Sequence, residues 1–389
     1  MNTILQWLLL ALAVAIGWGL GRWGRENASQ QDTMDDEASV RERLQFLFTN
    51  YSDETIENFV QSLDVSTDTI NLHLSIGAHF RNKGEVERAI LIHQNLLARP
   101  ELPARYSAEV TFALAQDYRA AGLLDRAEAL LQQLMGSPHF GIRAARELIA
   151  LYQQEKEWDK ARRVAMTLVE GDSDPTLRKT LAYILCELAD HALRHDDRFT
   201  ARQHLREALQ HDASCVRATL QLAELQHRDH RDREARVTLL RVFEQNPAFG
   251  PEAVDRLVRY AREQGDETRL LRKLRKLYDQ TPSTSLLLAI VDCVEKAQGR
   301  DAAIAVLRSE LENKPSLRGL LKLVRLSGRD AGFANDDARL VSRVGELLLS
   351  NRPVYCCVQC GFSGQQLHWR CPSCKTWEAV QPVQGVEGE

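Results

Sequence analysis

A small residue, an aromatic residue and a second small residue recur with a period of 34 residues in the stretch from Ala113 to Leu168. Tyr118 and Tyr152 lie 34 residues apart, and so do Ala127 and Ala161. A period of this length is typical of helix–turn–helix units that cannot bury their apolar faces alone and therefore stack on one another. This repeat constrains the fold more than any other feature of the chain.

A similar period extends in both directions from this stretch. Small residues recur at Ala89, Ala127, Ala161, Ala201, Ala235 and Ala303, with spacings of 38, 34, 40, 34 and 68 residues. The spacings of 38 and 40 residues contain prolines, and the spacing of 68 residues has room for one extra repeat. Glycines at 84 and 122 are placed to end first helices, and prolines at 247, 282 and 315 to separate units. An unspecific helical bundle is the competing interpretation, but the recurring 34 favours a tetratricopeptide-repeat (TPR) array.

Composition agrees with a helical array and excludes one class of partner. The chain has 389 residues, is 44% hydrophobic and only 6% aromatic, and contains few helix breakers, with 21 Gly and 11 Pro. The net charge of −4 provides no general attraction to nucleic acid. We find no glycine-rich phosphate loop, nucleophile elbow or His-Glu-x-x-His motif, so we predict no catalytic residues, no organic cofactor and no small-molecule substrate.

The N-terminus is predicted to be a transmembrane anchor. The segment from Ile4 to Leu20 is apolar apart from Gln6 and, as a helix, would span roughly 26 Å, close to the core of a bilayer. A cleaved signal peptide is the alternative, but residues 1–6 carry no basic side chain and no typical cleavage site follows. Arg22 and Arg25 follow the span, which places the bulk of the chain in the cytoplasm by the positive-inside rule.

Five of the eight cysteines lie close together near the C-terminus. Two Cys-x-x-Cys pairs stand ten residues apart, and each pair can direct two thiolates at one ion, with Cys357, Cys360, Cys371 and Cys374 as the predicted ligands. A closed shell of four thiolates favours a structural zinc or iron ion over a disulfide framework or a catalytic metal. A nucleic-acid-binding ribbon is the alternative, but only Arg370 and Lys375 add positive charge there.

Two other cysteine-module features lead to further expectations. Cys356 is the odd thiol of the cluster and is predicted to be a non-ligand. Phe362, Trp369 and Trp377 are more aromatic surface than so small a module can bury alone. We therefore expect them to pack against the preceding helix at 338–350 or against the array.

The combination of anchor, repeats and cysteine module resembles the lipopolysaccharide assembly protein B family of Gram-negative bacteria (LapB, also called YciM). The resemblance covers essentially the whole chain. It rests on repeat segments at 77–90 and 121–128 and on a rubredoxin-type module that matches at Tyr355, Cys357, Cys360, Gly361, Phe362, Trp369, Cys371, Pro372 and Cys374. Lys375 departs from that pattern, because a rubredoxin knuckle has glycine there.

The resemblance implies a function that spacing alone does not provide. Members of this family are inner-membrane adaptors that bring the deacetylase LpxC to the membrane protease FtsH, and an anti-adaptor of the LapC/PbgA type restrains them. The chain is then a non-catalytic adaptor that limits lipopolysaccharide synthesis. Two alternatives remain open: a membrane-tethered scaffold for lipopolysaccharide biosynthesis or export proteins without a proteolytic role, and a redox or metal sensor.

The predicted fold is therefore all-α, a TPR superhelical solenoid with an N-terminal transmembrane helix and a small C-terminal rubredoxin-like metal-binding knuckle module. The predicted domains are an anchor at 1–21, a polar linker at 22–39, a TPR array at 40–330, a connecting helix at 331–352, the metal-binding module at 353–380 and a tail at 381–389.

Overall fold

The structure, a computed structural model, describes residues 55, 66–171, 174–327 and 335–389. The chain divides into two compact units, Met1–Leu151 and Tyr152–Glu389, each with its own hydrophobic core. The predicted anchor at 1–21, the linker at 22–39 and the first part of the predicted array fall outside the described residues. Among the residues that are described, no helix is both long and apolar enough to cross a bilayer.

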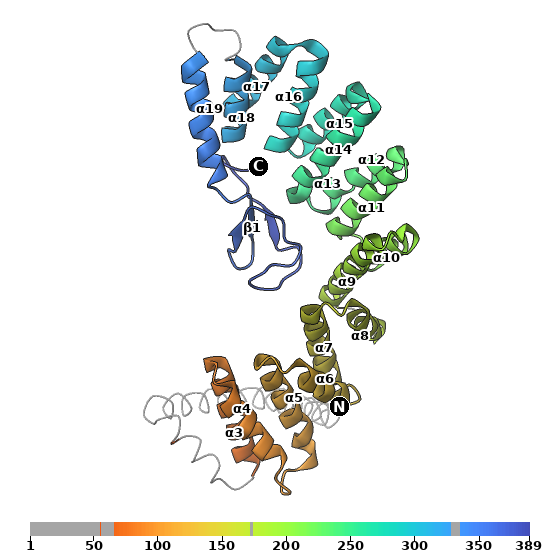
Figure 1. Ribbon diagram of the computed structural model, residues 1–389, viewed down its shortest axis with the longest axis vertical. Coiled ribbons are helices and arrows are strands. Elements are labelled where there is room, and N and C mark those ends of the chain that lie inside the picture. The colour runs from red at the N-terminus through yellow and green to blue at the C-terminus, as the bar shows by residue number, and fades with distance from the viewer. Residues whose placement is uncertain (1–54, 56–65, 172–173, 328–334) are drawn as a thin grey trace, which may run out of the picture. The chain divides into compact units, whose positions relative to one another are not determined.

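Helical hairpins build the described part of the first unit (Figure 1). Its helices are α3 (Thr67–Lys83), α4 (Val86–Leu97), α5 (Ala104–Ala120), α6 (Leu124–Leu134) and most of α7 (Gly141–Glu155). A buried polar cluster ties three of them together: the Asp117 carboxylate on α5 accepts from His93 on α4 and pairs with Arg81 on α3 at 2.6 Å. The side chains of Asp117 and His93 are fully buried, so this cluster is an internal tie.

The second unit continues the hairpins and ends in a small sheet. Its helices are α8 (Trp158–Gly171), α9 (Pro175–Arg194), α10 (Arg198–His211), α11 (Val216–Arg228), α12 (Asp232–Leu240), α13 (Val242–Gln245), the 3₁₀ turn η1 (Pro247–Phe249), α14 (Gly250–Gln264), α15 (Glu267–Gln280), α16 (Thr284–Gln298), α17 (Arg300–Asn313), α18 (Leu317–Ser327) and α19 (Asn335–Ser350). Figure 1 shows helices α9 to α19 following one another along an arc. The TPR array predicted from the period is confirmed.

The recurring small residue has one structural role throughout the array. It is the fourth residue of the second helix in six of the described hairpins, in α4, α6, α8, α10, α12 and α17, and each of these alanines is completely buried. A methyl side chain at this point allows the two helices of a hairpin to approach closely. In α15 the fourth residue is Leu270, also buried, and this substitution explains why the repeat between Ala235 and Ala303 looks degenerate in the sequence.

Helix ends follow local chemistry. Gly84 and Gly122 adopt left-handed backbone angles, with φ of 90° and 76°, as the αL cap of a first helix requires. Ser283 caps α16 by accepting a hydrogen bond from the Leu286 amide.

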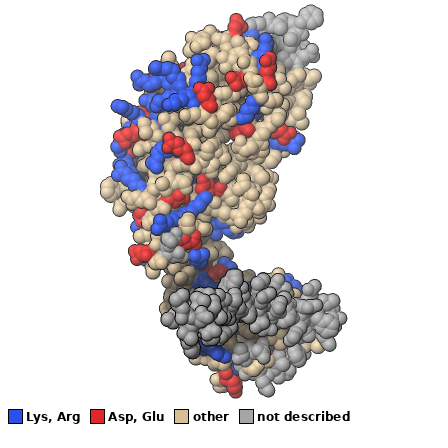
Figure 2. Space-filling view, turned by 180° about the vertical axis from the view of Figure 1, so that it is seen from behind, with Lys and Arg blue, Asp and Glu red and all other residues tan. Residues whose placement is uncertain are grey.

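Ion pairs connect successive hairpins of the second unit. Figure 2 shows Lys and Arg side chains interspersed with Asp and Glu over the face in view. Arg217 on α11 is buried and pairs with Glu187 and Asp190 on α9, each at 2.7 Å. More exposed pairs, such as Arg162 with Glu207, contribute roughly 0 to 1 kcal/mol each, so apolar burial carries most of the stability.

The C-terminal sheet has three short antiparallel strands in the order β2-β1-β3. Tyr355 of β1 (Tyr355–Cys357) pairs with Gly364 of β2 (Ser363–Gly364) and with Pro382 of β3 (Val380–Pro382). Strand β3 therefore crosses the boundary predicted at residue 380. We call residues 353–382 the ribbon.

The ribbon lies inside the arc and docks on the array (Figure 1). The Trp377 ring stacks on Tyr183 of α9 with centroids 4.9 Å apart, and the Trp369 ring stacks on Phe249 of η1 at 5.4 Å. Of the two packing partners expected for these tryptophans, the array is the correct one. Phe362 stays within the ribbon core, where its ring meets His368 edge to face.

Replacing Trp377 by Ala should undock the ribbon. The ring is 8% exposed, and its Nε1 donates to Gln153 Oε1 at 3.2 Å, so truncation leaves a cavity and an unpaired buried amide. We expect the free energy of unfolding of the second unit to fall by about 3 to 5 kcal/mol. Chemical denaturation monitored by circular dichroism measures this change. Val358→Ala in the same ribbon is the control, because Val358 is 71% exposed, and equal losses in the two variants would contradict the docking.

Candidate metal centre

Two turns of the same construction hold the four predicted ligands. In the first, the Gly361 amide donates to the Cys357 carbonyl at 2.9 Å, and in the second, the Lys375 amide donates to the Cys371 carbonyl at 3.0 Å. Gly361 has φ of 76° and Lys375 has φ of 62°. The left-handed angle explains why glycine suits both positions, and Lys375 adopts it at a cost of roughly 1 kcal/mol. The Lys375 ammonium donates to the Pro372 carbonyl across the turn, at 2.6 Å.

The two turns bring the four sulfur atoms to one point. All four Sγ atoms, of Cys357, Cys360, Cys371 and Cys374, lie within 4.8 Å of one another. The Sγ distance is 3.7 Å from Cys357 to Cys374 and 3.6 Å from Cys360 to Cys371. Four sulfurs at about 2.3 Å from a central zinc would be separated by roughly 3.8 Å, so the donor set fits a tetrahedral S₄ ion.

Hydrogen-bond donors and burial act in opposite directions on these thiols. The backbone amide of Phe362 is the main cause that lowers the pKa of Cys360, to about 6, and the Thr376 hydroxyl is the main cause that lowers the pKa of Cys374. Burial raises the pKa of Cys371 to about 11. Cys371 and Cys357 are buried, whereas Cys360 is exposed at the surface. Metal binding requires deprotonated thiols, so the Phe362 amide and the Thr376 hydroxyl both favour the thiolate form that a bound ion would need.

Two neighbouring donors stay outside the sulfur cluster. The Cys356 thiol lies 3.8 Å from the Cys357 carbonyl and 4.0 Å from that of Gly361, and it is not one of the four converging sulfurs. The His368 ring packs against Phe362 with centroids 5.9 Å apart. The converging donor set is thus four sulfurs. Zinc and iron both suit such a set, and either would act by cross-linking the two turns.

Polar contacts from the ribbon to the array were not foreseen from the sequence. Glu378 is buried, has φ of 58°, and pairs with Lys179 of α9 at 2.8 Å. The Tyr355 hydroxyl donates to Glu252 of α14 at 2.6 Å, and its pKa is raised by burial and by this carboxylate. Gln153 of α7 accepts from Trp377 Nε1 and, through its carbonyl, from Arg370 at 3.4 Å. The partners lie 103 to 224 residues apart in the chain, so no local sequence pattern predicts these contacts.

The ribbon matches a known family of metal-binding domains. The family described as the rubredoxin metal binding domain matches residues 355–382, which are the three strands and both turns. A tetratricopeptide repeat protein from Parabacteroides merdae is 14% identical, covers 71% of this chain and 98% of its own, and has a TM-score of 0.35.

Curated relatives match the chain from end to end. Lipopolysaccharide assembly protein B of Escherichia coli K12 is 31% identical over 99% of both chains. The protein of the same name from Haemophilus influenzae is 31% identical over 98% of this chain and 99% of its own. With a TPR array, a docked ribbon and relatives of this identity over their full length, the chain belongs to the lipopolysaccharide assembly protein B family.

Proposed function

We propose that this chain acts in lipopolysaccharide assembly as a non-catalytic adaptor that promotes FtsH-dependent proteolysis of the deacetylase LpxC. The observation that carries the proposal is the end-to-end match to lipopolysaccharide assembly protein B, with 99% of both chains covered. The four converging cysteines then serve as ligands of one structural zinc or iron ion.

The architecture suits binding better than chemistry. A stack of helical hairpins offers a long surface for other proteins. The exposed side chains of this surface can differ without disturbing the packing around the buried alanines. The S₄ set has the composition of a structural site, because four thiolates complete a tetrahedral shell.

The proposed location is the bacterial inner membrane, with a single N-terminal span at 1–21 and the bulk of the chain facing the cytoplasm. A tether in the membrane of the protease raises the effective concentration of the adaptor at FtsH without any new contact surface. An anti-adaptor of the LapC/PbgA type is the proposed restraining partner.

A scaffold without a proteolytic role is the second candidate. The name of the relatives, an assembly protein, favours it, because assembly alone requires only that lipopolysaccharide biosynthesis or export proteins be held together. The two candidates differ in what happens to LpxC.

Depletion of this protein should lengthen the half-life of LpxC in cells that contain FtsH. An adaptor accelerates degradation by delivering substrate, so its loss slows degradation only where the protease is active. Pulse-chase labelling of LpxC with and without this protein, in cells with active and inactive FtsH, measures the effect. An unchanged half-life in cells with active FtsH would reject the adaptor and leave the scaffold.

Cys371→Ser should abolish metal binding, and Cys356→Ser should not. Cys371 is one of the four converging sulfurs and is buried, whereas Cys356 lies next to the site but outside the cluster. Elemental analysis of the purified chain should find about one ion per chain for Cys356→Ser and almost none for Cys371→Ser. The reverse result, or equal metal in both variants, would refute the ligand assignment.

A further inference from the structure

The segment that follows the ribbon returns to the array and inserts a carboxylate into it. We call residues 383–389 the tail, which starts later than the predicted tail at 381 because strand β3 ends at Pro382. The Glu389 carboxylate accepts from the Ser285 amide at 2.9 Å and from the Ser285 hydroxyl at 2.6 Å, and it also pairs with Arg318. Its side chain is only 6% exposed. The tail therefore ends in a buried anion held by three donors from α16 and α18.

The rest of the tail contributes little to its own attachment. Residues 384–387 are exposed, and Val386 is 58% exposed, so almost no apolar surface holds them down. The Arg352–Glu387 ion pair at 3.3 Å is exposed on both sides and adds little. One backbone bond, from the Leu317 amide to the Val386 carbonyl at 2.8 Å, connects the middle of the tail to α18. Attachment thus depends mainly on the Glu389 carboxylate, and segments with so little burial open readily.

A tight turn aims this carboxylate. The Glu389 amide donates to the Val383 carbonyl at 2.9 Å, and the Gly388 amide donates to the Gly385 carbonyl at 3.0 Å. A Cβ atom on Gly388 would lie 1.9 Å from the Val383 oxygen, so only glycine fits this turn.

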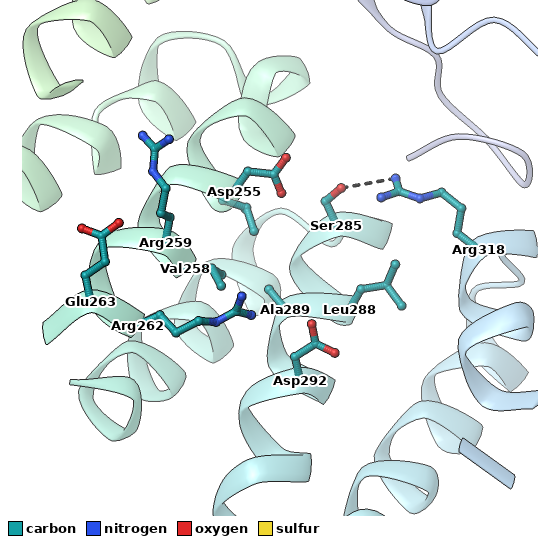
Figure 3. Close-up of a pocket in the computed structure, with 11 residues that line it drawn as sticks. Asp255, Val258, Arg259, Arg262, Glu263, Ser285, Leu288, Ala289, Asp292 and Arg318 are labelled. Atoms are coloured by element: carbon teal, nitrogen blue, oxygen red, sulfur yellow. Dashed lines mark hydrogen bonds between the residues drawn. The ribbon is translucent and has the colours of Figure 1, made fainter. Parts of the chain in front are cut away.

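Two cavities meet at the residues that hold the carboxylate. One, of about 600 Å³, lies between α14 and α16 and is shown in Figure 3 with Ser285 between Asp255 and Arg318. The second, of about 320 Å³, shares these three residues and is also lined by Glu389. Arg259, Arg262, Glu263 and Asp292 line the rest of the first cavity, which therefore carries charges of both signs. Asp255 borders the carboxylate, and burial, followed by the neighbouring Glu252, raises its pKa.

We propose that the Ser285–Arg318 site is a binding site for an acidic peptide segment of a partner protein, and that the tail occupies it in competition with that partner. The tail shows the ligand chemistry directly: a glutamate side chain presented by a glycine turn. The adjoining cavity of about 600 Å³ has room for the residues next to the acid. Displacement of the tail opens the site, and the partner gains the three donors that now hold Glu389.

The test uses the full-length chain and a labelled peptide. The probe is a fluorescein-labelled hexapeptide with the sequence of residues 384–389, amidated at its carboxyl end so that only side-chain carboxylates are present. Fluorescence anisotropy measures its dissociation constant. Glu389→Gln removes the charge of the tail, and Gly388→Ala prevents its turn while Glu389 remains, so either variant should tighten probe binding about tenfold or more. Glu387→Gln is the matched control, because that acid is exposed, and it should leave binding unchanged.

A second substitution checks the site itself. Adding Arg318→Gln to Glu389→Gln should weaken probe binding at least about tenfold, as should a probe whose last residue is glutamine. Thermal melting confirms that each variant is folded. The proposal is overturned if neither Glu389→Gln nor Gly388→Ala tightens binding, or if binding does not respond to Arg318→Gln.

Discussion

Four cysteine sulfurs lie at the distances that a tetrahedral ion requires, in a ribbon that is too small to fold by burial alone. The ribbon has three strands of two or three residues each, and its core contains two of the cysteines themselves. A module of this size normally requires a metal or disulfides. The two tryptophans that contact the array flank the second cysteine turn, so an ion that closed this turn would also fix the docking surface.

The docking connects the ribbon to helices that are far from it in the sequence. Trp377 reaches Tyr183 of α9 and Gln153 of α7, Trp369 reaches Phe249, and Tyr355 reaches Glu252 of α14. Aromatic pairs of this kind add about 0.5 to 1.5 kcal/mol each beyond the area they bury. The inner side of the arc is thus partly filled by the chain's own ribbon and tail. A partner must use the surface that remains or displace what is there.

Much of this fold was predictable, and the period shows why. The 34-residue repeat marks the fourth position of the second helix of a hairpin, which is a buried alanine in α4, α6, α8, α10, α12 and α17 and Leu270 in α15. Two spacings are longer, 38 and 40 residues, where the connecting segments contain prolines. The cysteine spacing likewise predicts the two turns, because ligand geometry is local. The contacts between ribbon and array were not predictable residue by residue, since Gln153, Tyr183 and Phe249 look like ordinary repeat residues. The only signal was an excess of aromatic side chains in the module. The carboxylate site of Glu389 gave no signal in the sequence.

Hydrogen exchange with and without metal tests the central claim that the ion organises the ribbon and, through it, the array. Exchange of backbone amides in α9 and α14 should become faster after chelation, because Tyr183 and Glu252 lose their ribbon partners. Helices α10 and α12 serve as controls, because no ribbon contact is described for them, and their exchange should change little. If chelation leaves α9 and α14 as protected as before, the array does not depend on the metal centre and the account is wrong.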